Sequence, residues 1–143
     1  MKLVLDTDIL VAGLRSQTGA SRQLLLWLFD ARYQAIVSVA MMLEYEAVLR
    51  RPENLKAFQL NAHDIEQFLD SMTHLIIPVT SFFLWRPQLR DPGDEHVLEA
   101  AVNGGADGIV TFNQRHFRGP AARFGIETFR PGEALWRIRT WQP

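Results

Sequence analysis

The 143-residue sequence contains no cysteine, very little lysine and no long apolar run. The lack of cysteine excludes a disulfide framework and the thiolate zinc sites of small structural domains. A membrane-spanning helix needs about 20 consecutive apolar residues, and no stretch approaches that length. The first apolar run is interrupted by Asp6 and Asp8, which does not fit a signal peptide. We therefore expect a cytoplasmic enzyme or partner-binding protein that does not enter a membrane.

The residues that are present have the balance of a globular protein, with 48% hydrophobic and 22% charged residues. This length predicts one domain, residues 1–143, that buries about two thirds of its unfolded surface. The net charge is −1, yet thirteen of the fifteen basic residues are arginine. Arginine binds phosphate bidentately, so its excess fits a phosphate-rich partner. A genome rich in GC, which codes arginine in place of lysine, is an alternative explanation.

Apolar periodicity predicts that strands and helices alternate, the order typical of an α/β fold with a parallel, helix-covered sheet. Strands are predicted at residues 2–6, 34–37, 75–79, 108–111 and 125–129. Helices are predicted at 9–14, 22–32, 39–51, 62–74, 94–103 and 131–138, with 53–61 and 81–92 as connecting segments. The expected N-terminal helix caps are Thr7 or Asp8, Ser21, Ser38 and Asn61 or Ala62.

Two acidic residues follow the first strand, Lys2-Leu-Val-Leu-Asp6, and its apolar run does not explain them. In open α/β sheets, ligands bind just beyond the carboxyl ends of the strands. Asp6 is therefore a candidate for a metal or phosphate site. Asp8 is expected to cap the next helix, or to support Asp6 without contacting the ligand itself.

Two further acids stand among apolar neighbours. Glu44 is flanked at helical spacing by Ala40, Met41, Ala47 and Val48, and Asp94 lines up with Val97, Leu98 and Ala101. A buried carboxylate is costly without a cation or a hydrogen-bond donor. A salt bridge from Glu44 to an arginine, and a capping role for Asp94 at its helix N-terminus, are the structural alternatives.

The fourth strand delivers Thr111 and Asn113 to the same edge, where they can contact water or phosphate. Asp6, Glu44 and Asp94 thus converge from one strand and two helices. Clustered carboxylates are hard oxygen ligands that suit Mg²⁺ or Mn²⁺. Such an ion can drive phosphodiester hydrolysis by activating water and stabilising the leaving oxygen.

These motifs, in their order, resemble the PIN-domain ribonucleases, and in particular the VapC-like bacterial toxins of toxin–antitoxin pairs. The matching segments are Val4–Gly13, Leu43–Pro52, Arg90–Ala100, Gly105–Asn113 and Phe129–Leu135. The resemblance implies a three-layer α/β/α domain with a central parallel sheet. It also implies metal-dependent endoribonuclease activity, with Asp6, Glu44 and Asp94 as metal ligands, a cognate antitoxin and a possible homodimer.

Three positions depart from the family pattern. Asn113 stands where many PIN domains have a fourth catalytic acid, and it can still contact a water molecule or coordinate weakly. Asp8 replaces a common asparagine and restores one negative charge. His116 occupies a position where relatives often have another acid. Asp8 and Thr111 are expected to support the metal ligands without contacting the ion themselves. The departures at the three positions can alter the activity.

RNA phosphates are expected to contact arginines near the acidic pocket, although surface salt bridges explain any single one. The candidates are Arg15, Arg22, Arg51, Arg90 and Arg115. The aromatic run 82–85 could stack bases, but core packing or a dimer contact is the favoured interpretation.

Two other functions are alternatives to the nuclease. A phosphatase of the haloacid-dehalogenase type also begins with Asp-x-Asp after a strand, but it needs a late lysine, and the only lysines are Lys2 and Lys56. A catalytically weakened PIN-like module that binds RNA or protein is supported by Asn113 and His116. Loss of metal binding would distinguish that module from the nuclease.

Overall fold

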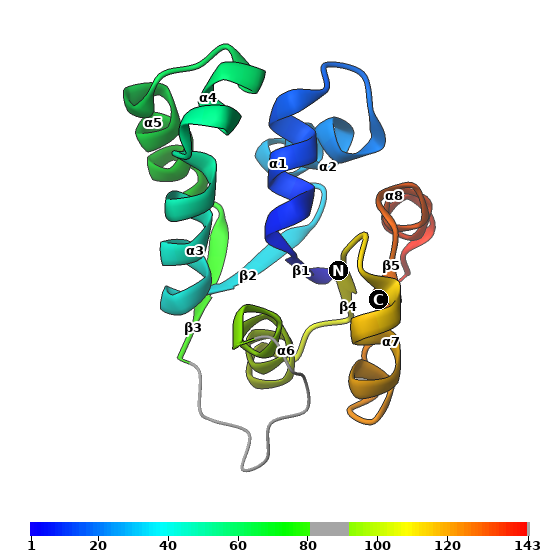
Figure 1. Cartoon of the computed structure of the whole chain (residues 1–143). Coiled ribbons are helices and arrows are strands. Elements are labelled where there is room, and N and C mark those ends of the chain that lie inside the picture. The colour runs from blue at the N-terminus through cyan, green and yellow to red at the C-terminus, as the bar shows by residue number, and fades with distance from the viewer. Residues whose placement is uncertain (81–91, 143) are drawn as a thin grey trace.

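Five strands form one parallel sheet in the computed structural model, which describes residues 1–80 and 92–142 (Figure 1). Their order across the sheet is β3-β2-β1-β4-β5. The strands are β1 (Lys2–Leu5), β2 (Gln34–Ser38), β3 (Ile76–Val79), β4 (Gly108–Val110) and β5 (Glu127–Phe129). The predicted parallel sheet is therefore confirmed.

Helices cover the sheet on both sides, giving three α/β/α layers. In Figure 1, α1 and α2 lie above the strands, and α6 lies below them in contact with β1, β2, β3 and β4. The helices are α1 (Thr7–Arg15), α2 (Ala20–Phe29), α3 (Val39–Leu49), α4 (Pro52–Phe58), α5 (Ala62–Thr73), α6 (Pro92–Gly104), α7 (Gln114–Ala122) and α8 (Pro131–Thr140).

Strand β1 lies at the centre of the sheet, with β2 on one side and β4 on the other. Its residues Leu3, Val4 and Leu5 are fully buried, as their continuous apolar run predicts. Because all strands are parallel, the carboxyl ends of β1, β2 and β4 meet at one edge. The chain segments that follow these three strands carry most of the candidate site.

Several predicted element boundaries are confirmed by local chemistry. The Ser38 hydroxyl accepts a hydrogen bond from the Met41 amide and caps α3. Asn61 and Asp64 form a capping box at the start of α5. Pro131 occupies the first turn of α8, and Gly105, with φ of 63°, follows the end of α6.

Two predicted caps were wrong. Helix α1 begins at Thr7, and its N-cap is Asp6, whose side chain accepts from the Thr7 amide, instead of Thr7 or Asp8. Helix α2 begins at Ala20 after Gly19, and the predicted cap Ser21 is buried inside the helix. In both cases the helix starts earlier than the apolar pattern indicates.

Two helices were not predicted. The segment 53–61, expected to be a connector, contains α4, which starts with Pro52 at its first turn. The buried Asn54 side chain donates to the Val48 carbonyl and fixes α4 against the end of α3. Helix α7 was missed because it is mostly polar and contains Pro120.

The predicted connecting segment 81–92 falls largely on residues outside those described, including Arg90 and the aromatic run 82–85. In the described part of the chain, no helix has the length and apolar character needed to cross a membrane.

Candidate active site

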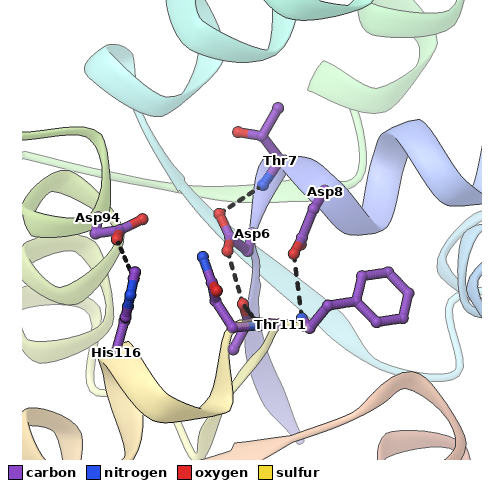
Figure 2. A network of polar contacts seen from close by, with 8 residues as sticks. Asp6, Thr7, Asp8, Asp94, Thr111 and His116 are labelled. Carbon is purple, nitrogen blue, oxygen red and sulfur yellow. Dashed lines mark hydrogen bonds and ion pairs between the residues drawn. The ribbon is translucent and has the colours of Figure 1, made fainter. Parts of the chain in front are cut away.

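Asp6 is the most deeply buried acid at the carboxyl edge of the sheet, with 7% of its surface exposed. Its Oδ1 accepts the Thr7 amide at 2.9 Å, and its Oδ2 accepts the Thr111 hydroxyl at 2.7 Å (Figure 2). The carboxylate thus caps α1 and also joins the ends of β1 and β4. Each oxygen keeps an acceptor position for a further partner.

The pKa of Asp6 is raised to about 6, mainly because burial disfavours the charged form. The hydrogen bond from Thr111 lowers the pKa, whereas the nearby negative charges of Asp94 and Glu44 raise it. The Asp6 carboxylate, directly after β1, therefore interacts electrostatically with the carboxylates of Glu44 on α3 and Asp94 on α6. The convergence predicted from the sequence is present in the fold.

Asp8 is the second residue of α1 and lies in its first turn. Its Oδ2 accepts the Phe112 amide at 3.2 Å, and its Oδ1 is buried with no hydrogen-bond partner among the residues that the structure describes. Burial and the charge of Asp6 raise the pKa of Asp8 to about 7. Asp8 holds the loop after β4 in place, which fits the supporting role predicted for it.

Glu44 projects from α3 toward the start of α1, where its Oε2 accepts the Thr7 hydroxyl at 2.8 Å. The next residue, Tyr45, is fully buried, and its hydroxyl donates to the Leu5 carbonyl. These two hydrogen bonds fix Glu44 relative to Asp6. The alternative of an arginine salt bridge finds no support among the ion pairs of the described residues; it is Glu46 that pairs with Arg50, on the surface.

Asp94 occupies the first turn of α6, where the helix dipole stabilises a negative charge. Its Oδ2 lies 3.3 Å from Nδ1 of His116 on α7, as Figure 2 shows. A histidine at the position of an expected acid thus faces a candidate metal ligand. When protonated, it would compensate part of the cluster's negative charge.

The loop between β4 and α7 carries the remaining predicted residues. Thr111 is fully buried and donates to Asp6, as expected for a residue behind the ligands. Asn113 is exposed at the N-cap of α7, and its side chain makes no capping hydrogen bond. Its amide therefore faces solvent at the sheet edge.

A cleft of about 680 Å³ opens beside the carboxylates between α1, α3, α4 and the β4–α7 loop. Thr7, Asp8 and Glu44 line it together with Arg15 and Arg51, two of the arginines predicted to contact RNA. Arg22 is not among its lining residues, and its guanidinium donates to the Ser16 and Leu14 carbonyls. Arg115 is exposed on α7 and also lies outside the lining, and Arg90 is outside the described residues.

Sequence reasoning missed the residues that hold the acids in place. Thr7 and Tyr45 position Glu44, and Phe112 carries the amide that Asp8 binds. Thr7 and Tyr45 each adjoin a candidate acid in the sequence, but hydroxyl groups are common in helices and gave no distinguishing signal. Their roles become visible only when α3 is packed against α1 and Tyr45 reaches the end of β1.

The donor set is made of oxygen atoms, which fits Mg²⁺ or Mn²⁺. Among the residues that the structure describes, no three acidic, histidine or cysteine side chains are close enough to enclose one ion. Mg²⁺ usually keeps several water ligands and binds through one or two carboxylates together with substrate phosphates. The buried Oδ1 of Asp8 has no hydrogen-bond partner among the described residues, and the charges of Asp94 and Glu44 add to the effect of burial on the pKa of Asp6. A cation at this edge would relieve both conditions.

Comparisons with known proteins agree with this architecture. One matching solved structure is VapBC2 from Rickettsia felis bound to a DNA fragment from their promoter, with a TM-score of 0.57 at 14% identity, covering 91% of this chain and 98% of that chain. Another is FitAcB from Neisseria gonorrhoeae, with a TM-score of 0.55 at 16% identity and the same two coverages. A comparison with curated proteins gave no significant match. The family model described as a PIN domain matches residues 2–115, and the chain therefore belongs to the PIN-domain family.

Proposed function

We propose that this protein is a divalent-metal-dependent endoribonuclease that hydrolyses RNA phosphodiester bonds and acts as the toxin of a toxin–antitoxin pair. The observation that carries the proposal is the buried Asp6 carboxylate at the carboxyl edge of the sheet, on which the negative charges of Asp94 and Glu44 both act. Such a concentration of negative charge is unfavourable unless a cation compensates it. Membership of the PIN-domain family supports nuclease chemistry for the same residues.

Asp6 and Asp94 would hold the ion, with Glu44 contributing from α3. When bound, Mg²⁺ or Mn²⁺ supplies an activated water nucleophile and stabilises charge on the leaving oxygen. Thr111 and the Thr7 amide orient the Asp6 carboxylate, and the Thr7 hydroxyl orients Glu44. Asn113 can donate to or accept from the reacting water or a phosphate oxygen at the rim of the site.

The cleft next to the carboxylates supports RNA as the substrate. Arg15 and Arg51 lie on its walls and provide positive charge for phosphate groups that approach the acids. Contacts of this kind position a nucleic-acid strand without reading its sequence. Charge neutralisation by Arg15 and Arg51 also offsets the repulsion between phosphates and carboxylates.

A cognate antitoxin is the expected protein partner. The similar chains belong to structures described as VapBC2 and FitAcB, and the order of sequence motifs resembles that of toxin–antitoxin proteins. Exposed apolar side chains, among them Val39 and Leu43 on α3, are available for contact with another chain or a second copy. We extend the proposal to an antitoxin complex and to a homodimer on this basis.

The proposal is tested first by calorimetric titration with Mn²⁺ and then by cleavage of a mixed RNA pool. The wild-type protein should bind Mn²⁺ at neutral pH and cut RNA only in the presence of the metal. Asp94→Asn should lose both properties and remain folded. Asp70→Asn, on the exposed surface of α5, is the matched control and should behave as wild type. A folded wild-type protein that binds no Mn²⁺ contradicts the proposal.

A second candidate function is a PIN-like module that binds RNA or protein without cutting it. The observations that favour it are Asn113 in place of an acid, and the absence of three closely grouped ligating side chains in the described residues. For such a module, RNA binding should persist in EDTA and no cleavage should occur with any divalent metal. The same titration and cleavage experiment therefore separates the two functions.

A further inference from the structure

An exposed phenylalanine stands next to the carboxylates on a backbone that is fixed on both sides. We propose that Phe112 is a base-stacking residue that positions unpaired RNA for cleavage. The inference rests on the proposed ribonuclease function and names a residue that neither the sequence motifs nor the family match assigns. It specifies single-stranded RNA, because a base within a duplex does not expose its face to a side chain.

Hydrogen bonds fix the backbone at Phe112 and its neighbour Thr111 on both sides of the ring-bearing residue. The Phe112 amide donates to Asp8, the Thr111 hydroxyl donates to Asp6 at 2.7 Å, and the Gln114 side chain donates to the Thr111 carbonyl at 2.7 Å. The aromatic side chain is nevertheless 51% exposed. In the part of the chain that the structure describes, it makes no ring-stacking or cation–π contact. The backbone is thus ordered at this point, while the ring remains available to a ligand.

Phe112 also lines two hollows. One is the cleft of about 680 Å³ that contains Asp8, Glu44, Arg15 and Arg51. The other is a smaller hollow of about 340 Å³ whose walls are mostly small residues of the α1–α2 connection and the start of α8. Both volumes fall within the range of about 300–1,000 Å³ that small-molecule sites occupy. Each is large enough for a nucleobase beside the ring.

The charges around the ring favour a nucleotide over a purely apolar ligand. Arg15 and Arg51 share the larger cleft with Phe112, so a base on the ring would place its phosphates near two guanidinium groups. Stacking on an aromatic face combined with backbone contacts to basic side chains is the usual mode of single-strand binding. Because every base has a stacking face, Phe112 should favour unpaired nucleotides without strongly selecting one base.

The test uses a single-stranded RNA octamer with 2-aminopurine at its centre and a fluorescein at one end. Binding is measured by anisotropy in Ca²⁺, base stacking by quenching of 2-aminopurine fluorescence, and cleavage by gel in Mg²⁺ or Mn²⁺. Phe112→Ala should weaken binding about tenfold and abolish the quenching, whereas Phe112→Trp should retain both. Phe124→Ala removes another exposed phenylalanine outside both hollows and should match wild type.

The outcomes separate this inference from the proposed function. If the wild-type protein cleaves RNA with metal but Phe112→Ala binds and quenches as wild type does, the stacking role is wrong and the nuclease proposal stands. In that case a protein partner becomes the favoured occupant of the exposed ring. If the wild-type protein neither binds nor cleaves the octamer, both proposals fail. A loss of affinity that is equal in Phe112→Ala and Phe124→Ala also overturns the stacking role.

Discussion

The hydroxyl of Tyr45 donates a hydrogen bond to the carbonyl oxygen of Leu5, and this bond joins the residue after Glu44 to the residue before Asp6. Both partners are fully buried. Asp6 and Glu44, two candidate metal ligands that are far apart in the sequence, are therefore held at a fixed relative position by a hydrogen bond that involves neither carboxylate. The geometry of the site depends on this contact between α3 and β1.

Replacing Tyr45 with phenylalanine should lower the free energy of unfolding by about 1–2 kcal/mol, because a buried carbonyl loses its donor. It should also weaken Mn²⁺ binding, since α3 can then shift relative to β1. Urea unfolding and calorimetric titration measure the two effects. Tyr33→Phe is the matched control, because its buried hydroxyl donates to the Leu24 carbonyl away from the site. Equal Mn²⁺ affinities in the two variants would show that the contact is structural only.

Replacing Thr111 with valine should raise the pKa of Asp6 above about 6, because the hydroxyl that stabilises the ionised carboxylate is lost. The variant should lose about 1–3 kcal/mol of stability at pH 8 and less at pH 5, where Asp6 is protonated. Urea unfolding at both pH values checks this result. Thr111→Ser keeps the hydroxyl and should retain most of the pH dependence of wild type. A loss that is the same at both pH values would contradict this role.

The metal-free protein should become less stable as the pH rises from about 4 to about 7. The pKa values of Asp6 and Asp8 are raised from 3.8 to about 6 and about 7, so the folded state binds more protons than the unfolded state in this window. The loss of folding stability that Asp6 causes over this pH range is at most about 3 kcal/mol. Asp8 is partly exposed and should contribute less than its shift implies.

Urea unfolding in EDTA at pH 5 to 8 measures this dependence. The double variant Asp6→Asn, Asp8→Asn should flatten it, and Mn²⁺ should reduce it in the wild-type protein by compensating the ionised carboxylates. If stability falls with pH as steeply in the double variant as in wild type, other titratable groups cause the pH dependence.

Replacing Asn113 with aspartate should strengthen Mn²⁺ binding about tenfold, because it adds a negative charge at the rim of the site. A tenfold change in affinity corresponds to about 1.4 kcal/mol of binding free energy. The same change should lower the stability of the metal-free protein, because it adds another negative charge to the cluster. Titration calorimetry and thermal unfolding in EDTA follow the two quantities. Gln67→Glu adds a charge to exposed α5 and should alter neither. An Asn113→Asp protein with unchanged Mn²⁺ affinity would place residue 113 outside the metal site.

Replacing Arg51 with alanine should weaken RNA binding to a similar degree for different sequences. It should also reduce the slope of log affinity against log salt concentration by about 1. Fluorescence anisotropy at several salt concentrations gives both values. Arg50→Ala is the control, because Arg50 pairs with Glu46 at 3.0 Å and does not line the cleft. If the two variants have the same effect, general surface charge explains the binding.

The sequence was sufficient to predict the sheet and the convergence of the acids. The buried run Leu3–Leu5 and the alternation of elements indicate a parallel sheet, and parallel strands bring their carboxyl ends to one edge. Asp6, Glu44 and Asp94 were conspicuous because carboxylates are rare among apolar neighbours. The three acids could therefore be grouped without knowledge of their separation.

Other features depend on tertiary contacts that no local pattern encodes. Helix α4 is joined to the end of α3 by the hydrogen bond from Asn54 to the Val48 carbonyl, and its own sequence has too few apolar residues to be distinguished from a connector. Asp6 was predicted as a metal ligand but not as the helix cap, and the structure shows that its side chain caps α1. The contact of His116 with Asp94 requires α6 and α7 to be placed side by side.

The hydrogen bond from Thr111 to Asp6 joins residues that are 105 positions apart in the chain. During synthesis, a nascent chain of about one hundred residues already contains Asp6, Glu44 and Asp94 but lacks β4, so β1 has no neighbour on that side. Contacts of such large sequence separation form late in folding. An incomplete translation product therefore carries the acids without the arrangement that brings them together. The link between the ends of β1 and β4 therefore forms only once Thr111, 105 positions after Asp6, has been synthesised.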